Sequence, residues 1–248
     1  MKRGAIDFLG IYLVIVCVWA FFVFGCASQP SIPVETNPET PVIETPKPIE
    51  YTAHWDGKKR KNINGACCEL VPSKVYTSYL VDAMEKYGND LLLSNPKDAE
   101  DYCPGYGKKT RQERIHMWVM IFSQLSEFES GFKPWTSYYE KNVADNPTSR
   151  GLFQMSKASA NGNYFCGIKD EMDLHDPKVN IECLVKAANI LVPEGNKYKS
   201  TPKKYRLASY IGGQNIGSVW QGLGAYWSPF RRIEQLNKIK AAAKSACN

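Results

Sequence analysis

Histidine is scarce in this chain of 248 residues, and the three that occur are scattered at His54, His116 and His175. No Cys-x-x-Cys pair accompanies them, so the ligand spacing typical of a zinc site is missing. The sequence also lacks Gly-x-Ser-x-Gly and His-Glu-x-x-His, which leaves serine-hydrolase and zincin functions without support. We therefore expect neither a metal nor another cofactor.

Charge is unevenly distributed along the chain. The formal net charge is +6, with 44% hydrophobic and 23% charged residues, a composition that excludes wholesale disorder. Residues 1–50 hold three basic and five acidic side chains, which leaves 28 basic and 20 acidic side chains, about +8, for residues 51–248. This sign favours a polyanionic partner, and nucleic acid, anionic lipid and bacterial wall polymer all fit it.

The N-terminus has the features of an export signal. Lys2 and Arg3 precede an apolar run from Phe8 to Phe24, the arrangement of a charged n-region and a hydrophobic h-region. Gly25-Cys26 at its end is similar to a bacterial lipobox, which predicts lipidation of Cys26. An uncleaved membrane anchor is the main alternative, and a buried core helix is the weakest. Both leading interpretations predict a membrane-anchored chain facing the bacterial periplasm or cell surface.

A proline-rich tether is predicted between the anchor and the folded part. Residues 27–50 contain six prolines and almost no periodic apolar pattern, which is typical of an extended, semi-rigid spacer. We divide the chain into residues 1–25 as signal peptide or membrane anchor, 26–50 as lipidated cysteine and tether, and 51–248 as one domain. The basic run at residues 58–61 lacks interleaved aromatics, so it indicates a solvated surface and not a nucleic-acid site.

The cysteines agree with an exported domain. Apart from Cys17 and Cys26, an even number remains, and in an oxidising compartment this predicts up to three disulfides. The sequence leaves all 15 possible connectivities open. A metal site is the weaker alternative. The candidates are Cys67, Cys68, Cys103, Cys166, Cys183 and Cys247.

Helical patterns dominate the domain, and strand patterns are weak. Apolar periodicity with start and stop signals predicts a helix that Ser73 begins, and a Thr110–Glu113 capping box opens a long second helix. A hairpin or irregular lobe is predicted between Trp135 and Gly151. The fold class is therefore mainly α with a small β lobe. Helices are expected over residues 73–86, from 110 to about 129, and over 179–191, 205–211 and 229–248.

Glu129 continues the apolar stripe of the long helix. The stripe comprises Ile115, Trp118, Val119, Phe122 and Leu125, and one more step of four reaches Glu129. Burial among these neighbours and the negative end of the helix dipole should both raise the pKa of Glu129. A carboxylic acid protonated near neutral pH suits a general acid for glycosidic cleavage. The alternative is a helix-end residue paired with Lys133 or Arg150. Glu127 should face solvent.

Four short motifs follow one another from residue 129 to residue 213. They are Glu129-Ser-Gly-Phe, Ser149-Arg-Gly-Leu-Phe-Gln-Met-Ser, Asp176-Pro with Asn180-Ile, and Leu207-Ala-Ser-Tyr-Ile-Gly-Gly. Together they resemble the lysozyme superfamily, particularly soluble-lytic-type lytic transglycosylases and, less closely, animal lysozymes. The resemblance implies an α+β lysozyme-like domain with a glycan cleft, and peptidoglycan as substrate. We expect a monomer that cleaves the MurNAc–GlcNAc β-1,4 bond.

The resemblance also implies roles for individual residues. Glu129 falls on the family's catalytic glutamate, and Tyr210 on a tyrosine beside it. Gly151 and Gln154 match a turn that lines the cleft, although Gln154 could instead satisfy loop carbonyls and Tyr210 could be a core residue. The expected substrate-binding set is Ser130, Ser149, Gly151, Phe153, Gln154, Met155 and Tyr210.

Ser149 departs from the pattern of animal lysozymes, which carry an aspartate at that position. This weakens a mechanism with two carboxylates, although Asp145 could still supply a second one. In the simpler mechanism Glu129 acts alone and the product is a 1,6-anhydro sugar; hydrolysis is the other outcome. Sugar stacking is considered for Trp118, Trp135, Trp220 and Trp227, with Trp118 favoured as core. The alternative function is a non-catalytic wall-binding lipoprotein or an accessory of a secretion machine.

Overall fold

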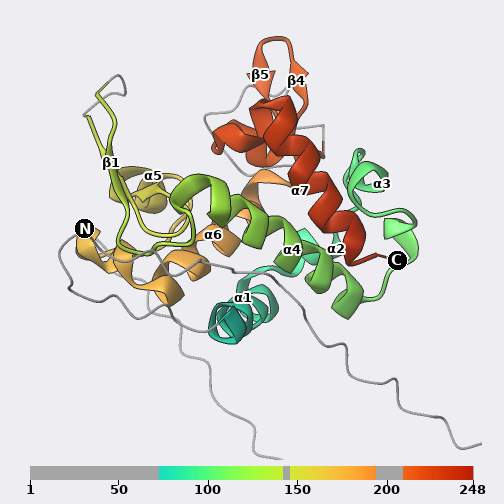
Figure 1. The fold of residues 1–248 in the computed structure, drawn as a ribbon, viewed down its shortest axis with the longest axis horizontal. Coiled ribbons are helices and arrows are strands. Elements are labelled where there is room, and N and C mark those ends of the chain that lie inside the picture. Colours follow the sequence, from blue (N-terminus) through green and yellow to red (C-terminus); the bar gives the residue numbers. More distant parts are fainter. Residues whose placement is uncertain (1–72, 142–145, 194–208, 248) are drawn as a thin grey trace, which may run out of the picture. The chain divides into compact units, whose positions relative to one another are not determined.

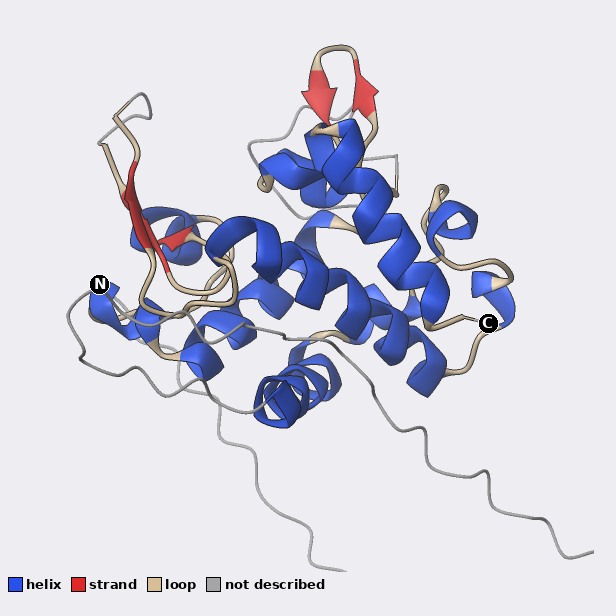
Figure 2. Ribbon diagram, viewed as in Figure 1, coloured by secondary structure: helices blue, strands red, loops and turns tan. Residues whose placement is uncertain are grey.

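The computed structural model of the chain describes residues 73–141, 146–193 and 209–247. Predictions on Cys26, the tether, Cys67, Cys68 and Asp145 lie outside these residues. Figures 1 and 2 show that helices dominate the described part and that its strands are short. The longer helices are α1 (Ser73–Tyr87), α4 (Arg111–Ser130), α6 (Pro177–Leu191) and α7 (Ile233–Ser245). Shorter helices are α2 (Asn89–Leu93), α3 (Ala99–Tyr102) and α5 (Lys157–Gly162), with 3₁₀ turns η1 (Tyr106–Lys108), η2 (Glu171–His175), η4 (Gly222–Ala225) and η5 (Ser228–Arg231).

Helix α4 begins and ends where the sequence predicts. The Thr110 hydroxyl accepts from the Glu113 N–H at 3.3 Å, and the Glu113 carboxylate accepts from the Thr110 N–H at 2.7 Å, which confirms the capping box. Gly131 ends the helix in the left-handed region (φ 58°), and its N–H donates to the Glu127 carbonyl. Every residue of the predicted apolar stripe is fully buried. The last turn of α4 therefore carries Glu129 to the edge of the core.

Packing between helix pairs builds this core. Helix α4 packs against α7, and α1 packs along α6 (Figure 1). The Trp118 and Phe122 rings of α4 stack with their centroids 5.4 Å apart. No helix within the described ranges is both long enough and apolar enough to cross a membrane.

Two helix predictions near the C-terminal end need correction. Of the helix predicted over 205–211, residues 209–211 are described, and these are not helical. The buried Asp98 carboxylate accepts from the N–H groups of Ile211 and Gly212 at 2.7 and 3.1 Å, and holds them in an irregular loop. The helix predicted from Pro229 starts at Ile233, because η5 precedes it.

The predicted hairpin between Trp135 and Gly151 is present and belongs to a small sheet. Strands β1 (Ser137–Tyr139), β2 (Thr148–Arg150) and β3 (Met155–Ser156) pair antiparallel in that order. In the register Tyr138 lies opposite Ser149, and Ser149 lies opposite Ser156. A second antiparallel pair joins β4 (Asn215–Ile216) to β5 (Val219–Trp220). The fold is thus α+β with a small β lobe, as predicted.

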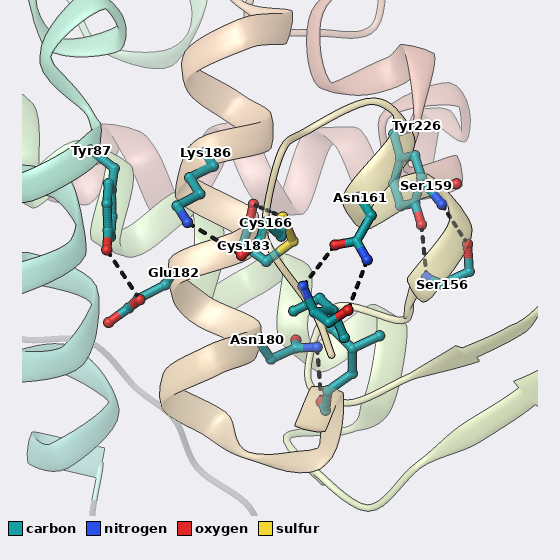
Figure 3. Close-up of a disulfide and its surroundings, with 12 residues drawn as sticks. Tyr87, Ser156, Ser159, Asn161, Cys166, Asn180, Glu182, Cys183, Lys186 and Tyr226 are labelled. Atoms are coloured by element: carbon teal, nitrogen blue, oxygen red, sulfur yellow. Dashed lines mark hydrogen bonds between the residues drawn. A yellow bond between two sulfur atoms is a disulfide. The ribbon is translucent and has the colours of Figure 1, made fainter. Parts of the chain in front are cut away.

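Two disulfides join distant segments. Cys103 bonds to Cys247, which ties the end of α3 to the residues after α7. Cys166 bonds to Cys183, which ties the loop after α5 to α6 (Figure 3). Closing loops of 144 and 17 residues stabilises the fold by about 5 and about 3 kcal/mol on the chain-entropy model. The disulfide prediction is therefore confirmed for these four cysteines.

Candidate active site

Glu129 lies in the last turn of α4, partly buried, whereas Glu127 is exposed as predicted. Burial is the main cause that raises the pKa of Glu129, to about 7. Arg232 and Arg231 act in the opposite direction through their positive charge, and the charge of Glu140 raises the pKa further. The predicted high pKa of Glu129 is confirmed, and the carboxyl group can hold a proton near neutral pH.

The alternative of a helix-end ion pair is wrong. Among the described residues Glu129 takes part in no ion pair, and Arg150 instead pairs with Glu171 at 2.6 Å. A partly buried carboxyl group without an ion-pair partner holds its proton more tightly, because burial disfavours its charged form.

Glu140 is a second carboxylate near Glu129, and sequence reasoning missed it. Its backbone N–H donates to the Pro147 carbonyl at 3.0 Å, which extends the β1–β2 hairpin by one residue. The Ser149 hydroxyl donates to Glu140 Oε1. Ser149, whose identity argued against a second carboxylate, therefore orients one. The hairpin predicted from the sequence was the signal that could have indicated Glu140, since it places the residue after β1 beside the start of β2.

The charge of Glu140 also reaches Tyr226. Burial is the main cause that raises the pKa of Tyr226, and Glu140 raises it further. The Tyr226 hydroxyl accepts from the Ser156 N–H at 3.3 Å (Figure 3). Tyr226 thus links the sheet to the segment before α7, within reach of the charge of Glu140.

Gly151 and Asn180 hold the turn between β2 and β3. Gly151 has a φ of 80°, and a Cβ there would lie 2.1 Å from the Leu174 carbonyl oxygen. The fully buried Asn180 amide accepts from the Phe153 N–H at 2.9 Å and donates to the Arg150 and Leu174 carbonyls at 3.1 and 3.0 Å. The close approach that requires glycine is therefore to the protein's own backbone and to α6.

Three of the expected substrate-binding residues have internal roles. Gln154 donates from its amide nitrogen to the Thr136 and Gly151 carbonyls at 3.0 and 2.8 Å, so it satisfies loop carbonyls. Phe153 and Met155 have fully buried side chains, which does not fit direct contact with a glycan. These residues form the support of the turn.

Ser130 and Tyr210, two further predicted site residues, form no hydrogen bond with Glu129 within the described residues. The buried Ser130 hydroxyl donates to the Ser126 carbonyl at 3.1 Å. The Tyr210 ring lies 5.8 Å from Lys97 Nζ, and no hydrogen bond within the described residues joins Tyr210 to Glu129. Of the four tryptophans, Trp118 and Trp227 are buried, Trp220 is partly exposed, and Trp135 is exposed.

Arg231 and Arg232 bring positive charge near the Glu129 carboxyl group. The Arg231 guanidinium donates to the Gly224, Ala225 and Tyr226 carbonyls at 2.7, 3.1 and 3.2 Å, which fixes its position. Arg232 follows it just before α7 and interacts with Glu129 through its charge. In the parts of the chain that are described, no cluster of three or more His, Cys, Asp or Glu side chains is suited to a metal ion.

Among the comparisons with known proteins, only the comparison with solved structures found matches. No protein-family model matches the sequence, and no curated protein matches it either. Solved structures of DslA from Bdellovibrio do match, at TM-scores of 0.62, 0.60 and 0.59 with 28%, 29% and 28% identity. Each alignment covers 73% of this chain and 94% of the DslA chain.

The fold is lysozyme-like. At this coarse level the chain resembles glycosidases. Two of the DslA structures are variants in which glutamine replaces one of two glutamates, and those glutamates lie eleven positions apart in DslA.

Proposed function

We propose that this chain cleaves the glycan strands of peptidoglycan at the MurNAc–GlcNAc β-1,4 bond, with Glu129 as general acid. The observation that carries the proposal is a glutamate at the end of α4 whose pKa burial raises to about 7, free of any ion pair among the described residues. A protonated Glu129 would give its proton to the bridging oxygen as the bond to the anomeric carbon breaks. The lysozyme-like fold supports glycan cleavage at the superfamily level.

Glu140 is the second carboxylate of the proposed mechanism. A carboxylate near the acid either attacks the anomeric carbon or activates a water molecule, and both routes are hydrolytic. Glu129 and Glu140 are eleven positions apart, the same spacing as the two glutamates substituted in DslA. This favours hydrolysis over the anhydro-forming route in which Glu129 acts alone.

Digestion of purified sacculi tests the catalytic assignment. Glu129→Gln should lower the rate of muropeptide release by about 10²–10⁴-fold, and Glu140→Gln should also lower it strongly. Glu127→Gln is the matched control, because Glu127 lies in the same turn but is exposed. Full activity in Glu129→Gln would refute the assignment, and sacculus binding without any release by the unaltered chain would favour a wall-binding protein.

The chemistry of the released ends separates the two routes. Mass spectrometry should find normal reducing ends if Glu140 takes part as proposed. Products that end only in 1,6-anhydro sugars would show that Glu129 works without a second carboxylate.

We also propose that the chain is exported and membrane-anchored, with the lipid on Cys26. This rests on the charged n-region, the apolar run and the Gly25-Cys26 pair. Metabolic labelling with a radioactive fatty acid should mark the chain, and Cys26→Ala should abolish the label. A labelled Cys26→Ala variant would contradict the lipidation site.

A further inference from the structure

Tyr138 lies on the same face of the hairpin as the Glu140 carboxylate. Side chains alternate between the two faces of a strand, so Tyr138 and Glu140 share one face and Tyr139 lies on the other. Tyr138 is directly opposite Ser149 in the register, and the Ser149 hydroxyl donates to Glu140. The Tyr138 side chain therefore projects beside the proposed second carboxylate.

The Tyr138 side chain is available to a ligand. It is 68% exposed, and within the described residues neither its ring nor its hydroxyl forms a hydrogen bond or ring contact. The short antiparallel strands β1 and β2 fix its backbone, so binding has to order only the side-chain torsions of Tyr138.

We propose that the Tyr138 ring stacks against a pyranose ring of the bound glycan strand, next to the bond that is cleaved. This inference rests on the proposed function and adds a substrate-binding residue to it. A pyranose presents an uncharged face of C–H groups, and the electron-rich face of an aromatic ring attracts such groups. Tyrosine also offers a large rigid contact area with few rotatable bonds, which is why it is common at binding hot spots.

Tyr139 provides a matched control. It is the next residue of the same strand, has the same side chain and is 52% exposed, but it faces the opposite side of the hairpin. Removing either ring should leave the fold intact, because both side chains are exposed, and melting temperatures would verify this.

Binding to sacculi is measured with the full chain carrying Glu129→Gln, so that the glycan is not consumed. Adding Tyr138→Ala should weaken binding by about tenfold, which corresponds to about 1.4 kcal/mol. Adding Tyr138→Phe should retain binding because the ring remains, and adding Tyr139→Ala should leave it unchanged. Equal losses of sacculus binding from Tyr138→Ala and from Tyr139→Ala would overturn the proposal. A loss of binding from Tyr138→Phe as large as that from Tyr138→Ala would overturn it as well.

Steady-state kinetics on soluble glycan fragments in the otherwise unaltered chain give an independent readout. Tyr138→Ala should raise KM by about tenfold and change kcat by less than about twofold, because stacking is made equally in the ground and transition states. A fall in kcat with unchanged KM would contradict stacking. If the unaltered chain released no fragments, the proposed function would fail, whereas the sacculus-binding comparison would still decide the role of Tyr138.

Discussion

Replacing Glu129 by glutamine should make the stability of the protein less sensitive to pH. The pKa of this carboxyl group is raised to about 7 in the folded chain, against 4.5 for the free group. Between these two values the folded state binds more protons than the unfolded state, so stability falls as pH rises through this window. Glutamine has a similar shape but does not ionise, and the variant should not show this fall.

The size of the effect follows from the two pKa values. One pH unit corresponds to about 1.36 kcal/mol, so the step from 4.5 to about 7 corresponds to at most about 3 kcal/mol. Glu129→Gln should therefore match the unaltered protein near pH 4 and be more stable by up to about 3 kcal/mol at pH 8. For a domain of this size that difference raises the melting temperature by about 6–12 °C.

Urea unfolding with intact disulfides at pH 4, 6 and 8 measures the difference. Glu127→Gln is the control, because its exposed carboxyl should give a difference that is small at every pH. A stability difference between Glu129→Gln and the unaltered chain that stays constant from pH 4 to pH 8 would refute the reasoning. In that case the glutamine variant would lose stability with rising pH as steeply as the unaltered chain.

Three further outcomes are expected. The rate of sacculus digestion should fall as pH rises through about 7, because Glu129 must carry a proton to act as an acid; a rate still rising at pH 9 would contradict this. Ser149→Ala should lower kcat by about tenfold, but it should have little further effect when combined with Glu140→Gln, and additive losses in that double-mutant cycle would argue against coupling. Gly151→Ala should cost at least about 2 kcal/mol in urea unfolding, whereas Gly162→Ala, with open space around its Cβ, should cost almost nothing; equal costs would be inconsistent with the close approach to Leu174.

Local signals sufficed where the interactions are themselves local. The capping box of Thr110 and Glu113 lies within one helical turn, and the apolar stripe of α4 follows from the helical period, so the start, buried face and end of α4 were predictable. The raised pKa of Glu129 follows from the same periodicity, since the stripe that buries Leu125 continues to the carboxyl group.

Contacts between distant segments could not be predicted in this way. The irregular loop at Ile211 depends on the Asp98 carboxylate, 113 residues earlier in the chain, which takes N–H groups that a helix would have used. Glu140 was missed for a related reason, because its bond to Ser149 exists only after the hairpin has folded back. Asp145, which the sequence suggested in its place, lies outside the described residues.

Motif resemblance alone did not separate residues that contact a ligand from those that support the contact. Phe153 and Met155 belong to the motif that the resemblance assigns to the cleft, yet both side chains lie in the core. Gln154 has a positive φ of 47°, and its side-chain amide donates to the Gly151 carbonyl of its own loop; residue type reveals neither feature.

The single Asn180 side chain bonds three backbone groups in two segments, the β2–β3 turn and η2, and this has a consequence for how the protein opens. The amide hydrogen of Phe153 can exchange with solvent only after its hydrogen bond to the Asn180 side chain breaks. The same opening frees the carbonyls of Arg150 and Leu174. Amides around the β2–β3 turn and the start of α6 should therefore exchange with deuterium at one common rate, as one cooperative unit.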